Sequence, residues 1–356
     1  MKLVVEQGAT LSREAARDLV TEVLSGEASD LEIGALLTAL ATRGETADEL
    51  TGFAEAMRAL AVPLQLTEEE RAELVDTCGT GGDGRGTFNI STGAALVAVA
   101  AGAKVAKHGN RAVTSKCGSA DVLEALGVPV GLGPEQAVAC LRATGFMFLL
   151  APAMHPAMKR VAPVRRALGF RTIFNLAGPL TNPAGARAQV LGVSPQSMLP
   201  VVAGAMARLG VRRAFVAHGS DGLDEITVSG ETSLAEVTGH RDPQTNRERE
   251  QLPVGAVRLF RLFPEDVGVS RASLSELAGG ETAQENAFLL EQVFAGDAGP
   301  RRDIVLINAA AALVAAGVAA DFPDGIARSV EAIDSGAVRK TVAELNAFRA
   351  SLSSVS

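Results

Sequence analysis

The sequence predicts an α/β fold in which a small N-terminal helical unit precedes a larger domain with a mainly parallel central sheet and flanking helices. Two observations support this prediction. In the first 60 residues, apolar side chains recur every three or four positions, the spacing that places them on one face of a helix. From about residue 73, short β-branched runs alternate with alanine-rich stretches, which is typical of parallel βαβ units. A chain of 356 residues is long enough for two packed units.

The N-terminal unit is predicted to contain three amphipathic helices, over residues 12–25, 29–43 and 46–60. The second and third begin with capping boxes, in which a Ser or Thr side chain and a Glu three residues later bond free backbone N–H groups. These boxes are Ser29 with Glu32 and Thr46 with Glu49.

The larger domain is predicted to begin near residue 73. Its expected strands are 73–77, 103–106, 146–150, 189–193, 214–217 and 226–228. Ligands of parallel sheets bind beyond the carboxyl ends of the strands, so the loops that follow strands are the places to look for a site. Residues 240–251 are polar and are predicted to form a solvated loop.

Charge is distributed unevenly along the chain. Residues 1–83 carry 6 Lys/Arg and 17 Asp/Glu, residues 84–220 carry 15 and 3, and residues 221–356 carry 12 and 21. The formal net charge of −8 argues against a dedicated nucleic-acid binder. An acidic chain with a basic middle third is instead expected to hold an anion. The basic residues expected on outer helix faces are Arg160, Arg166, Arg208, Arg212 and Arg213.

The composition predicts a cytoplasmic protein without a membrane segment. The three cysteines, Cys78, Cys117 and Cys140, are too scattered for a disulfide framework or a zinc site. No signal-peptide core follows the N-terminus. The longest apolar run near the C-terminus, residues 309–320, has 12 residues, whereas a spanning helix needs about 20.

A glycine-rich loop follows the first predicted strand. Five glycines fall within residues 79–86, and Asn89, Ser91 and Thr92 come just before a helix expected to begin at Gly93. Glycine lets backbone N–H groups approach phosphate oxygens, and a helix N-terminus offers free N–H donors. The loop contains G-x-G-x-x-G, but no acid between residues 83 and 121 could bind a ribose, and no Walker lysine follows. A dinucleotide or nucleoside triphosphate is therefore disfavoured.

A basic loop follows the second predicted strand. Lys107 lies at the strand end, where a point charge for phosphate belongs, and His108 comes next. Between residues 84 and 120 there are five Lys/Arg and no acid. Ser115 and Ser119 add hydroxyl groups for phosphate oxygens. The two loops together predict a phosphate-binding site.

These segments resemble the motifs of the anthranilate phosphoribosyltransferase family. The similar stretches are 76–83, 89–92, 107–111, 118–121, 169–175, 178–183 and 218–225, in the same order over nearly the whole chain. The resemblance implies transfer of the 5-phosphoribosyl group of phosphoribosyl pyrophosphate to the amine of anthranilate, with release of pyrophosphate. This reaction is the second step of tryptophan biosynthesis from chorismate.

The resemblance also implies an architecture and partners. It implies a small helical domain, formed by residues 1–70 and about 153–186, hinged to a large α/β domain formed by residues 71–152 and 187–356. The implied cofactor is Mg²⁺, two ions per monomer. The implied partners are the small molecules anthranilate and phosphoribosyl pyrophosphate and a second copy of the chain in a homodimer, with no nucleic acid and no membrane.

The functional residues of the family carry over by position. Those expected to bind phosphoribosyl pyrophosphate are Gly79, Gly82, Asp83, Thr87, Asn89, Ile90, Ser91, Thr92, Lys107, His108, Gly109, Asn110, Arg111, Ala112, Val113, Thr114, Ser115 and Ser119. Those expected to bind anthranilate are Gly79, Asn110 and Arg165, whose guanidinium offers a fork for a carboxylate. The expected metal ligands are Ser91, Asp224 and Glu225. His108 is the hypothesis for the catalytic group that accepts the proton leaving the amine.

Two departures from the family and two alternatives bear on this interpretation. The family usually has Ser where Ala112 and Cys117 stand, so weaker phosphate affinity at most is expected, without loss of function. One alternative is a pyrimidine nucleoside phosphorylase of similar fold, which needs no metal pair such as Asp224 and Glu225. The other is a non-enzymatic relative that binds nucleic acid through a basic groove, which the net charge of −8 opposes.

Overall fold

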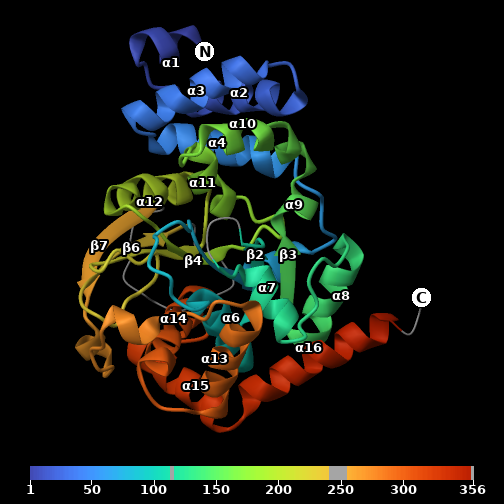
Figure 1. Cartoon of the computed structure of the whole chain (residues 1–356), viewed down its shortest axis with the longest axis vertical. Helices are drawn as coiled ribbons and strands as arrows, with labels where there is room; N and C mark the ends of the chain where they lie inside the picture. Colours follow the sequence, from blue (N-terminus) through green and yellow to red (C-terminus); the bar gives the residue numbers. More distant parts are fainter. Residues whose placement is uncertain (113–115, 240–254, 354–356) are drawn as a thin grey trace.

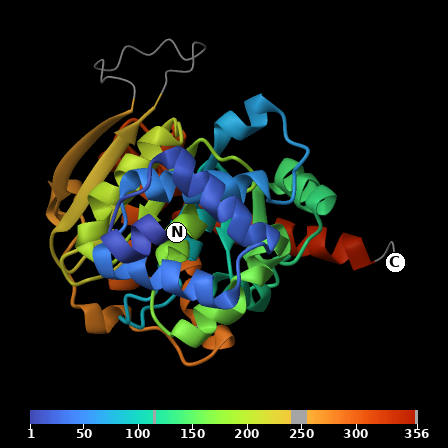
Figure 2. The same cartoon turned by 90° about the horizontal axis from the view of Figure 1, so that it is seen from above.

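The computed structural model describes residues 1–112, 116–239 and 255–353. A layer of helices lies at one end of the molecule, above an α/β domain built on a seven-stranded sheet (Figure 1). The predicted fold class is therefore confirmed. Seen from above, the first helices lie across the middle of the molecule, and the end of the C-terminal helix projects to one side (Figure 2).

The helical layer begins with four helices in chain order. These are α1 (Lys2–Gln7), α2 (Arg13–Ser25), α3 (Asp30–Arg43) and α4 (Ala47–Ala59). The last three are the predicted helices, and both predicted capping boxes form. Helix α1 was not predicted, because six residues are too few to show a helical period.

Helices from the middle of the chain complete this layer. They are α9 (Ala151–Met154), a 3₁₀ turn (Pro156–Arg160), α10 (Ala162–Leu168) and α11 (Ile173–Ala177). Apolar side chains of α10 and α11 share one core with α2, α3 and α4. The rings of Phe53 and Phe174 meet edge to face with centroids 5.5 Å apart, which joins α4 to α11.

The sheet contains a parallel part and an antiparallel edge. The parallel strands are β1 (Leu74–Gly79), β2 (Lys104–Gly109), β3 (Phe146–Leu150), β4 (Ala188–Gly192) and β5 (Arg213–Gly219). The antiparallel strands are β6 (Thr232–Thr238) and β7 (Ala256–Leu262). The spatial order is β3-β2-β1-β4-β5-β6-β7. The chain therefore reverses its direction of winding between β1 and β4, the place where open α/β sheets bind ligands.

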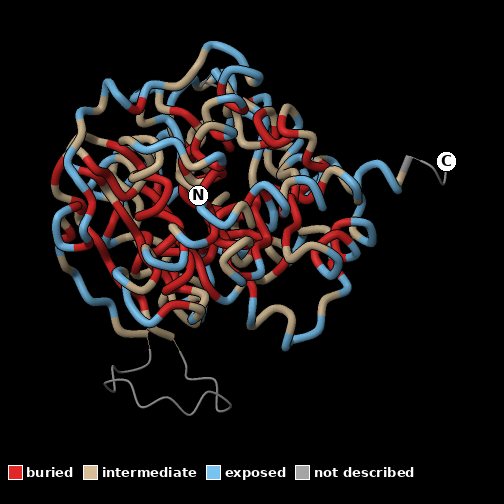
Figure 3. The backbone as a smooth tube through the Cα atoms, turned by 90° about the horizontal axis from the view of Figure 1, so that it is seen from below, coloured by how far each residue is buried: buried red, intermediate tan, exposed pale blue. Residues whose placement is uncertain are grey.

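Helices cover both faces of the sheet. They are α5 (Glu68–Glu73), α6 (Ile90–Ala100), α7 (Ser119–Ala125), α8 (Pro134–Thr144), α12 (Leu199–Arg208), α13 (Ala283–Ala295), α14 (Pro300–Ala316), α15 (Phe322–Asp334) and α16 (Ala337–Ser353). One face packs on α6 and α13–α16, and the other packs on α8, α12 and the helical layer. Buried backbone is concentrated between these layers (Figure 3). Among the described helices, none is long and apolar enough to cross a membrane.

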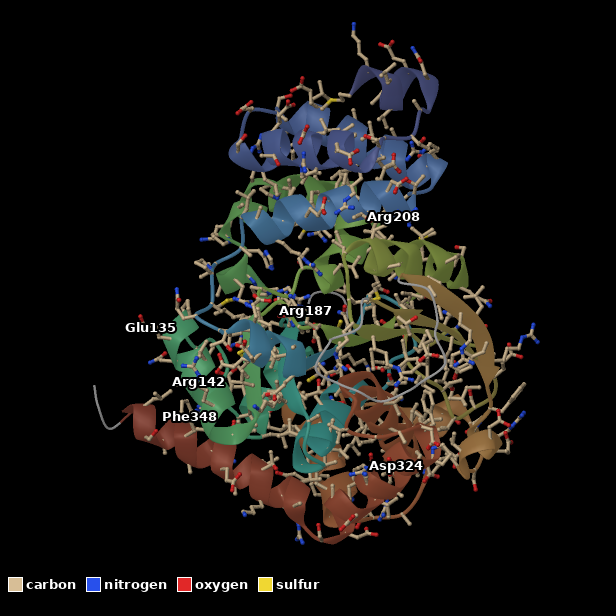
Figure 4. All side chains as sticks on the ribbon, turned by 180° about the vertical axis from the view of Figure 1, so that it is seen from behind. Glu135, Arg142, Arg187, Arg208, Asp324 and Phe348 are labelled. Carbon is tan, nitrogen blue, oxygen red and sulfur yellow. The ribbon has the colours of Figure 1, made fainter. Side chains whose placement is uncertain are left out.

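Several local predictions need correction. The run 226–228 is a loop, because Ile226 and Val228 are buried by packing on α14 and its neighbours without pairing to a strand. Strands β6 and β7 were not predicted. Arg213 lies in β5 and pairs with Glu236 at 2.7 Å, so it is not on an outer helix face. Arg208 does lie on a helix, where it joins α12 to α4 through Asp48 at 2.7 Å (Figure 4). The solvated loop predicted at 240–251 lies outside the described residues.

Candidate active site

Four neighbouring strands end in glycine at the carboxyl edge of the sheet. They are Gly79, Gly109, Gly192 and Gly219, which end β1, β2, β4 and β5. Side chains alternate along a strand, so these positions face the same side as the buried residues that pack on α6 and α14. A Cβ atom at Gly79 or Gly192 would overlap Asp224, and one at Gly109 would overlap Ser119. The glycines thus let the loops of the site lie directly on the strand ends.

Two adjacent carboxylates lie over the ends of β1 and β4. The Oδ2 atom of Asp224 accepts a hydrogen bond from the N–H of Gly81 at 2.6 Å, and Oε1 of Glu225 accepts one from Ser91 at 3.1 Å. Burial raises the pKa of both carboxyl groups, and the charge of Asp83 beside Asp224, and of Asp224 beside Glu225, raises each further. The pair is therefore a concentration of poorly solvated negative charge that a cation would stabilise.

The buried ammonium group of Lys107 lies on the same face. Its Nζ donates to the carbonyl oxygen of Thr77 and lies 3.4 Å from the Oγ atom of Ser91. Helix α6 begins at Ile90, three residues before the predicted start, so Ser91 and Thr92 stand in its first turn. Burial lowers the pKa of Lys107, and the negative charge of Asp76 opposes this shift. Within the described chain, the hydrogen bonds of this ammonium go to uncharged oxygens, which leaves its charge available to an anion.

The glycine-rich loop itself needs glycine at several positions. Gly81, Gly82, Gly84 and Gly86 have φ angles between 67° and 70°, a backbone conformation that other residues rarely adopt. The guanidinium of Arg171 donates to the carbonyl oxygen of Gly81 at 2.7 Å. This bond ties the loop to the segment between α10 and α11, and sequence analysis did not identify Arg171 as a site residue.

The far end of the loop is held by backbone and core contacts. Thr87 forms an antiparallel bridge with Ala278, and Phe88 is buried. The side chain of Ile90 is also buried, so only its backbone can face a ligand. The Nδ2 atom of Asn89 donates to the carbonyl oxygen of Cys117 at 3.2 Å, while its buried Oδ1 has no partner among the described residues. Asn89 thereby joins the glycine-rich loop to the basic loop.

The basic loop is closed by the carboxylate of Asp121. Its Oδ2 accepts hydrogen bonds from the N–H groups of Ala112 and Gly118, both at 2.9 Å. The Nη1 atom of Arg111 pairs with Asp121 at 3.1 Å and with Glu124 at 2.8 Å.

The same loop presents a hydroxyl group next to Asn110, because Ser119 Oγ donates to the carbonyl oxygen of Asn110 at 3.3 Å. The predicted ligand-binding residues Val113, Thr114 and Ser115 lie outside the described residues.

The opposite face of the same strand ends carries two imidazole groups. His108 points away from Lys107, and its ring lies 5.1 Å from that of His155 between centroids. The Nε2 atoms of both rings are buried without a hydrogen-bond partner among the described residues. Burial lowers the pKa of His108 to about 3, and the neighbouring His155 contributes to this shift. This imidazole is therefore uncharged at neutral pH.

A buried carboxyl group supports the backbone of His108. Asp76 on β1 accepts hydrogen bonds from the N–H of His108 at 3.2 Å and from Nδ2 of Asn182 at 2.9 Å. The same Nδ2 donates to the carbonyl oxygen of Ala106 at 2.7 Å. The backbone pairing between β1 and β2 stops at Val75 and Val105. Beyond that point, the side chains of Asp76 and Asn182 bond the backbone of β2 instead. Burial raises the pKa of Asp76 to about 6, against the opposing charge of Lys107.

Arg165 lies on α10 in the helical layer. Its Nη2 is 3.4 Å from Oδ1 of Asn175, and its guanidinium lies 5.6 Å from the ring centroid of Phe174. Burial lowers the pKa of Arg165. The ion pairs of the described residues do not include it, so this partly desolvated cation is suited to the carboxylate of a ligand.

The oxygen donors present are of the kind that Mg²⁺ prefers. Asp224 and Glu225 supply carboxylates, and Ser91 supplies a hydroxyl group next to Glu225. The described residues contain no group of three or more His, Cys, Asp or Glu arranged to hold a metal. A cation bound here would therefore need further oxygen ligands, which phosphate groups of a substrate can supply.

Comparison with known proteins agrees with this geometry. Residues 3–61 match the glycosyl transferase family helical bundle domain, and residues 71–339 match the glycosyl transferase family a/b domain. An anthranilate phosphoribosyltransferase of Solibacter usitatus is 54% identical over 351 residues, which cover 99% of this chain and 98% of that protein. The chain belongs to the anthranilate phosphoribosyltransferase family.

Solved structures of this family have the same fold. The enzyme from Thermus thermophilus superposes with a TM-score of 0.87 at 42% identity, with 98% of each chain covered. The Saccharomyces cerevisiae enzyme in complex with PRPP and Mg superposes with a TM-score of 0.84 at 27% identity, covering 98% of this chain and 96% of that one. The same yeast enzyme has been solved with 4-fluoroanthranilate, with a TM-score of 0.82 at 27% identity, covering 98% of this chain and 96% of that one.

Proposed function

We propose that this chain transfers the 5-phosphoribosyl group of phosphoribosyl pyrophosphate to the amine of anthranilate. The products are N-(5-phosphoribosyl)anthranilate and pyrophosphate, in the second step of tryptophan biosynthesis. Membership of the family supports this function, as do the relatives that bind PRPP, Mg and 4-fluoroanthranilate. The observation that carries it is the carboxylate pair Asp224–Glu225, which lies against the glycine-rich loop and the start of α6.

The phosphoribosyl substrate is proposed to bind on the face of the sheet that carries Lys107. Backbone N–H groups of the glycine-rich loop and of Thr92 in the first turn of α6 can bind phosphate oxygens. The ammonium of Lys107 supplies a charge beneath them. The proposed ligand residues among those described are Gly79, Gly82, Asp83, Thr87, Asn89, Ile90, Ser91, Thr92, Lys107, Gly109, Asn110, Arg111, Ala112 and Ser119, together with His108, whose side chain lies on the opposite face.

Two Mg²⁺ ions per monomer are proposed to be held by Ser91, Asp224 and Glu225 together with substrate oxygens. Magnesium supplies charge neutralisation for the leaving pyrophosphate when it is bound. The chain's own part is to hold the two carboxylates over the strand ends, which Gly79 and Gly192 permit by leaving room for Asp224. The hydrogen bonds from Gly81 and Ser91 hold this arrangement, so we expect little reorganisation during the reaction.

Anthranilate is proposed to approach from the opposite face, with Gly79, Asn110 and Arg165 around it. Arg165 would bind the carboxylate of anthranilate and so orient its amine toward the ribose. An aromatic amine is neutral at pH 7, so no base is needed before bond formation. We propose that Nε2 of His108, a buried nitrogen without a partner among the described residues, receives the proton afterwards.

Loss of anthranilate fluorescence tests this function. With phosphoribosyl pyrophosphate and Mg²⁺, the fluorescence should fall, and EDTA should stop the fall. No metal-dependent loss of fluorescence would refute the proposal. Phosphorolysis of thymidine or uridine in its place would favour a nucleoside phosphorylase.

Assembly, domain division and compartment are further proposals. We propose a homodimer formed through the helical layer, because the large apolar side chains of Leu3, Val5 and Leu31 are exposed there. We also propose that residues 1–70 and about 153–186 form the helical domain, since α10 and α11 share its core. A cytoplasmic location is supported by Cys78 and Cys140, which are thiols as a reducing compartment favours.

A further inference from the structure

A buried asparagine of α14 holds the loop that carries the two carboxylates. Asn308 is only 2% exposed. Its Oδ1 accepts a hydrogen bond from the N–H of Ile226 at 3.0 Å, and its Nδ2 donates to the carbonyl oxygen of Ile226 at 2.9 Å. The same Nδ2 donates to the carbonyl oxygen of Ile304, one turn earlier, at 2.9 Å. One side chain therefore satisfies both backbone groups of the residue next to Glu225.

The loop between β5 and β6 has no regular structure, and side chains add to the backbone hydrogen bonds that fix its path, such as the one from Ser220 N–H to the carbonyl oxygen of Glu231 at 2.8 Å. From inside the loop, Asp221 accepts hydrogen bonds from the N–H of Leu223 at 3.1 Å and from Oγ1 of Thr227 at 2.6 Å. From outside the loop, the side chain of Asn308 on α14 bonds both backbone groups of Ile226. Among the described residues, these are the hydrogen bonds that join the Ile226 backbone to the rest of the molecule. Asp224 and Glu225 lie between these two supports.

The outer support acts on the residue that directly follows the two carboxylates. Asp224 is buried and Glu225 is half-buried, and they accept hydrogen bonds from the N–H groups of Gly81 and Ser91. Turning either side chain away from these donors requires a change in the loop backbone. The two bonds from Asn308 oppose that change, because they fix the backbone at the position that follows Glu225.

We propose that Asn308 is a positioning residue, which holds the backbone of Ile226 so that Asp224 and Glu225 both face a divalent cation. The inference rests on the proposed function for the role of that cation. Asn308 touches neither substrate nor metal, and its effect passes through the loop. Supporting residues of this kind typically change metal affinity by about 10- to 100-fold when they are replaced.

Two variants test this role. Asn308→Leu keeps a similar volume but removes all three hydrogen bonds. Asn308→Asp keeps the acceptor for the N–H of Ile226 but loses the donors to the carbonyl oxygens. The matched control is Asn346→Leu, since Asn346 on α16 is half-buried and its Nδ2 donates to the carbonyl oxygen of Leu126, at the end of α7, at 3.2 Å. This bond lies outside the loop that carries Asp224 and Glu225.

The primary readout is Mn²⁺ binding, measured by electron paramagnetic resonance in the presence of phosphoribosyl pyrophosphate. Asn308→Leu should raise the dissociation constant of Mn²⁺ about tenfold or more, and Asn308→Asp should raise it less. Asn346→Leu should lower the Tm yet leave the dissociation constant of Mn²⁺ at the wild-type value. The half-saturating concentration of Mg²⁺ for turnover should follow the same order.

An unchanged Mn²⁺ affinity in a folded Asn308 variant would overturn the proposal, and so would an equal change in the Asn346 control. If Asn308→Leu does not fold, Asn308→Asp decides the question by the same criterion. The failure of the proposed function would look different. The wild-type chain would then bind Mn²⁺ and respond to Asn308 substitution, yet would not consume anthranilate.

Discussion

The two faces of the sheet at its carboxyl edge differ sharply in chemistry. One face gathers Lys107, the start of α6 and the pair Asp224–Glu225, so it carries charges of both signs. The other face carries the uncharged imidazoles of His108 and His155, with Arg165 beyond them in the helical layer. Lys107 and His108 are neighbours in sequence and still belong to different faces, because side chains alternate along a strand. One strand end therefore presents different chemistry on the two sides of the sheet.

The largest effect is expected from the carboxylates of the charged face. Asp224→Asn combined with Glu225→Gln should lower turnover by about 10³-fold, because the neutral amides cannot balance the charge of the leaving pyrophosphate with bound cations. Turnover is measured by anthranilate fluorescence over a range of Mg²⁺ concentrations.

The control is Glu236→Gln, which replaces a buried acid that pairs with Arg213 at 2.7 Å and Arg258 at 2.6 Å. Glu236→Gln should lower the stability of the protein and leave the dependence of turnover on Mg²⁺ concentration unchanged. A double variant with near wild-type turnover would remove the carboxylates from the mechanism.

Lys107 should matter next. Lys107→Met keeps most of the buried stem but removes the charge, and we expect kcat/KM for phosphoribosyl pyrophosphate to fall by about 10²-fold. The KM for anthranilate should change little. Lys104→Met is the control on the same strand, because Lys104 is exposed and pairs with Glu73 at 2.5 Å. Equal losses in the two variants would contradict a phosphate role for Lys107.

Substitution of Arg165 tests the face of the sheet that carries His108 and His155. Arg165→Gln should raise the KM for anthranilate by about tenfold or more, the loss expected for a charged hydrogen bond to a carboxylate. The KM for phosphoribosyl pyrophosphate should remain near that of the wild type. The exposed neighbour Arg166→Gln should affect neither value. If the KM for phosphoribosyl pyrophosphate rose more than the KM for anthranilate, Arg165 would not be the residue that binds anthranilate.

The smallest effect concerns pH and stability. The folded state holds the pKa of His108 near 3, below its ordinary 6.5, so the unfolded state binds the proton first as pH falls. His108 therefore makes stability fall below pH 6.5, by about 1.4 kcal/mol per pH unit at most. Asp76 has the opposite effect on stability, because the folded state raises its pKa from 3.8 to about 6. The stability that protonated Asp76 adds at low pH is therefore lost as the pH rises from 3.8 to 6.

Urea unfolding of wild type and His108→Asn at pH 7 and pH 5 separates these contributions. The variant keeps Asp76 but lacks the His108 proton, so its stability should fall less on acidification than that of the wild type. Equal losses in both proteins would show that His108 is not buried in its neutral form.

Much of the fold could be predicted because local signals agree with the final structure. The capping boxes at Ser29 and Thr46 start helices where the sequence places them. Helix α1 and strands β6 and β7 escaped prediction, since the first is six residues long and the strands have mixed polarity. The run at Ile226 looked like a strand because it is apolar, but its burial comes from packing against α14 and its bonds come from Asn308.

The site shows the same division between local and long-range information. The glycine-rich loop, Lys107 and the carboxylate pair carry motifs that stand out in the sequence. Gly192 and Asn308 lie in none of these motifs, and Arg171 lies in the similar stretch 169–175 without a site role being predicted for it. Each of the three matters through a contact with a segment far along the chain. For Gly192 the available signal was its place at the end of the short apolar run of β4, since β1, β2 and β5 also end in glycine.

Steady-state kinetics with both substrates varied, applied to Lys107→Met and Arg165→Gln side by side, test the two-face arrangement most directly. The predicted result is a crossing pattern, in which the first variant impairs use of phosphoribosyl pyrophosphate and the second impairs use of anthranilate. If both variants impair the same substrate, the two faces do not serve different substrates.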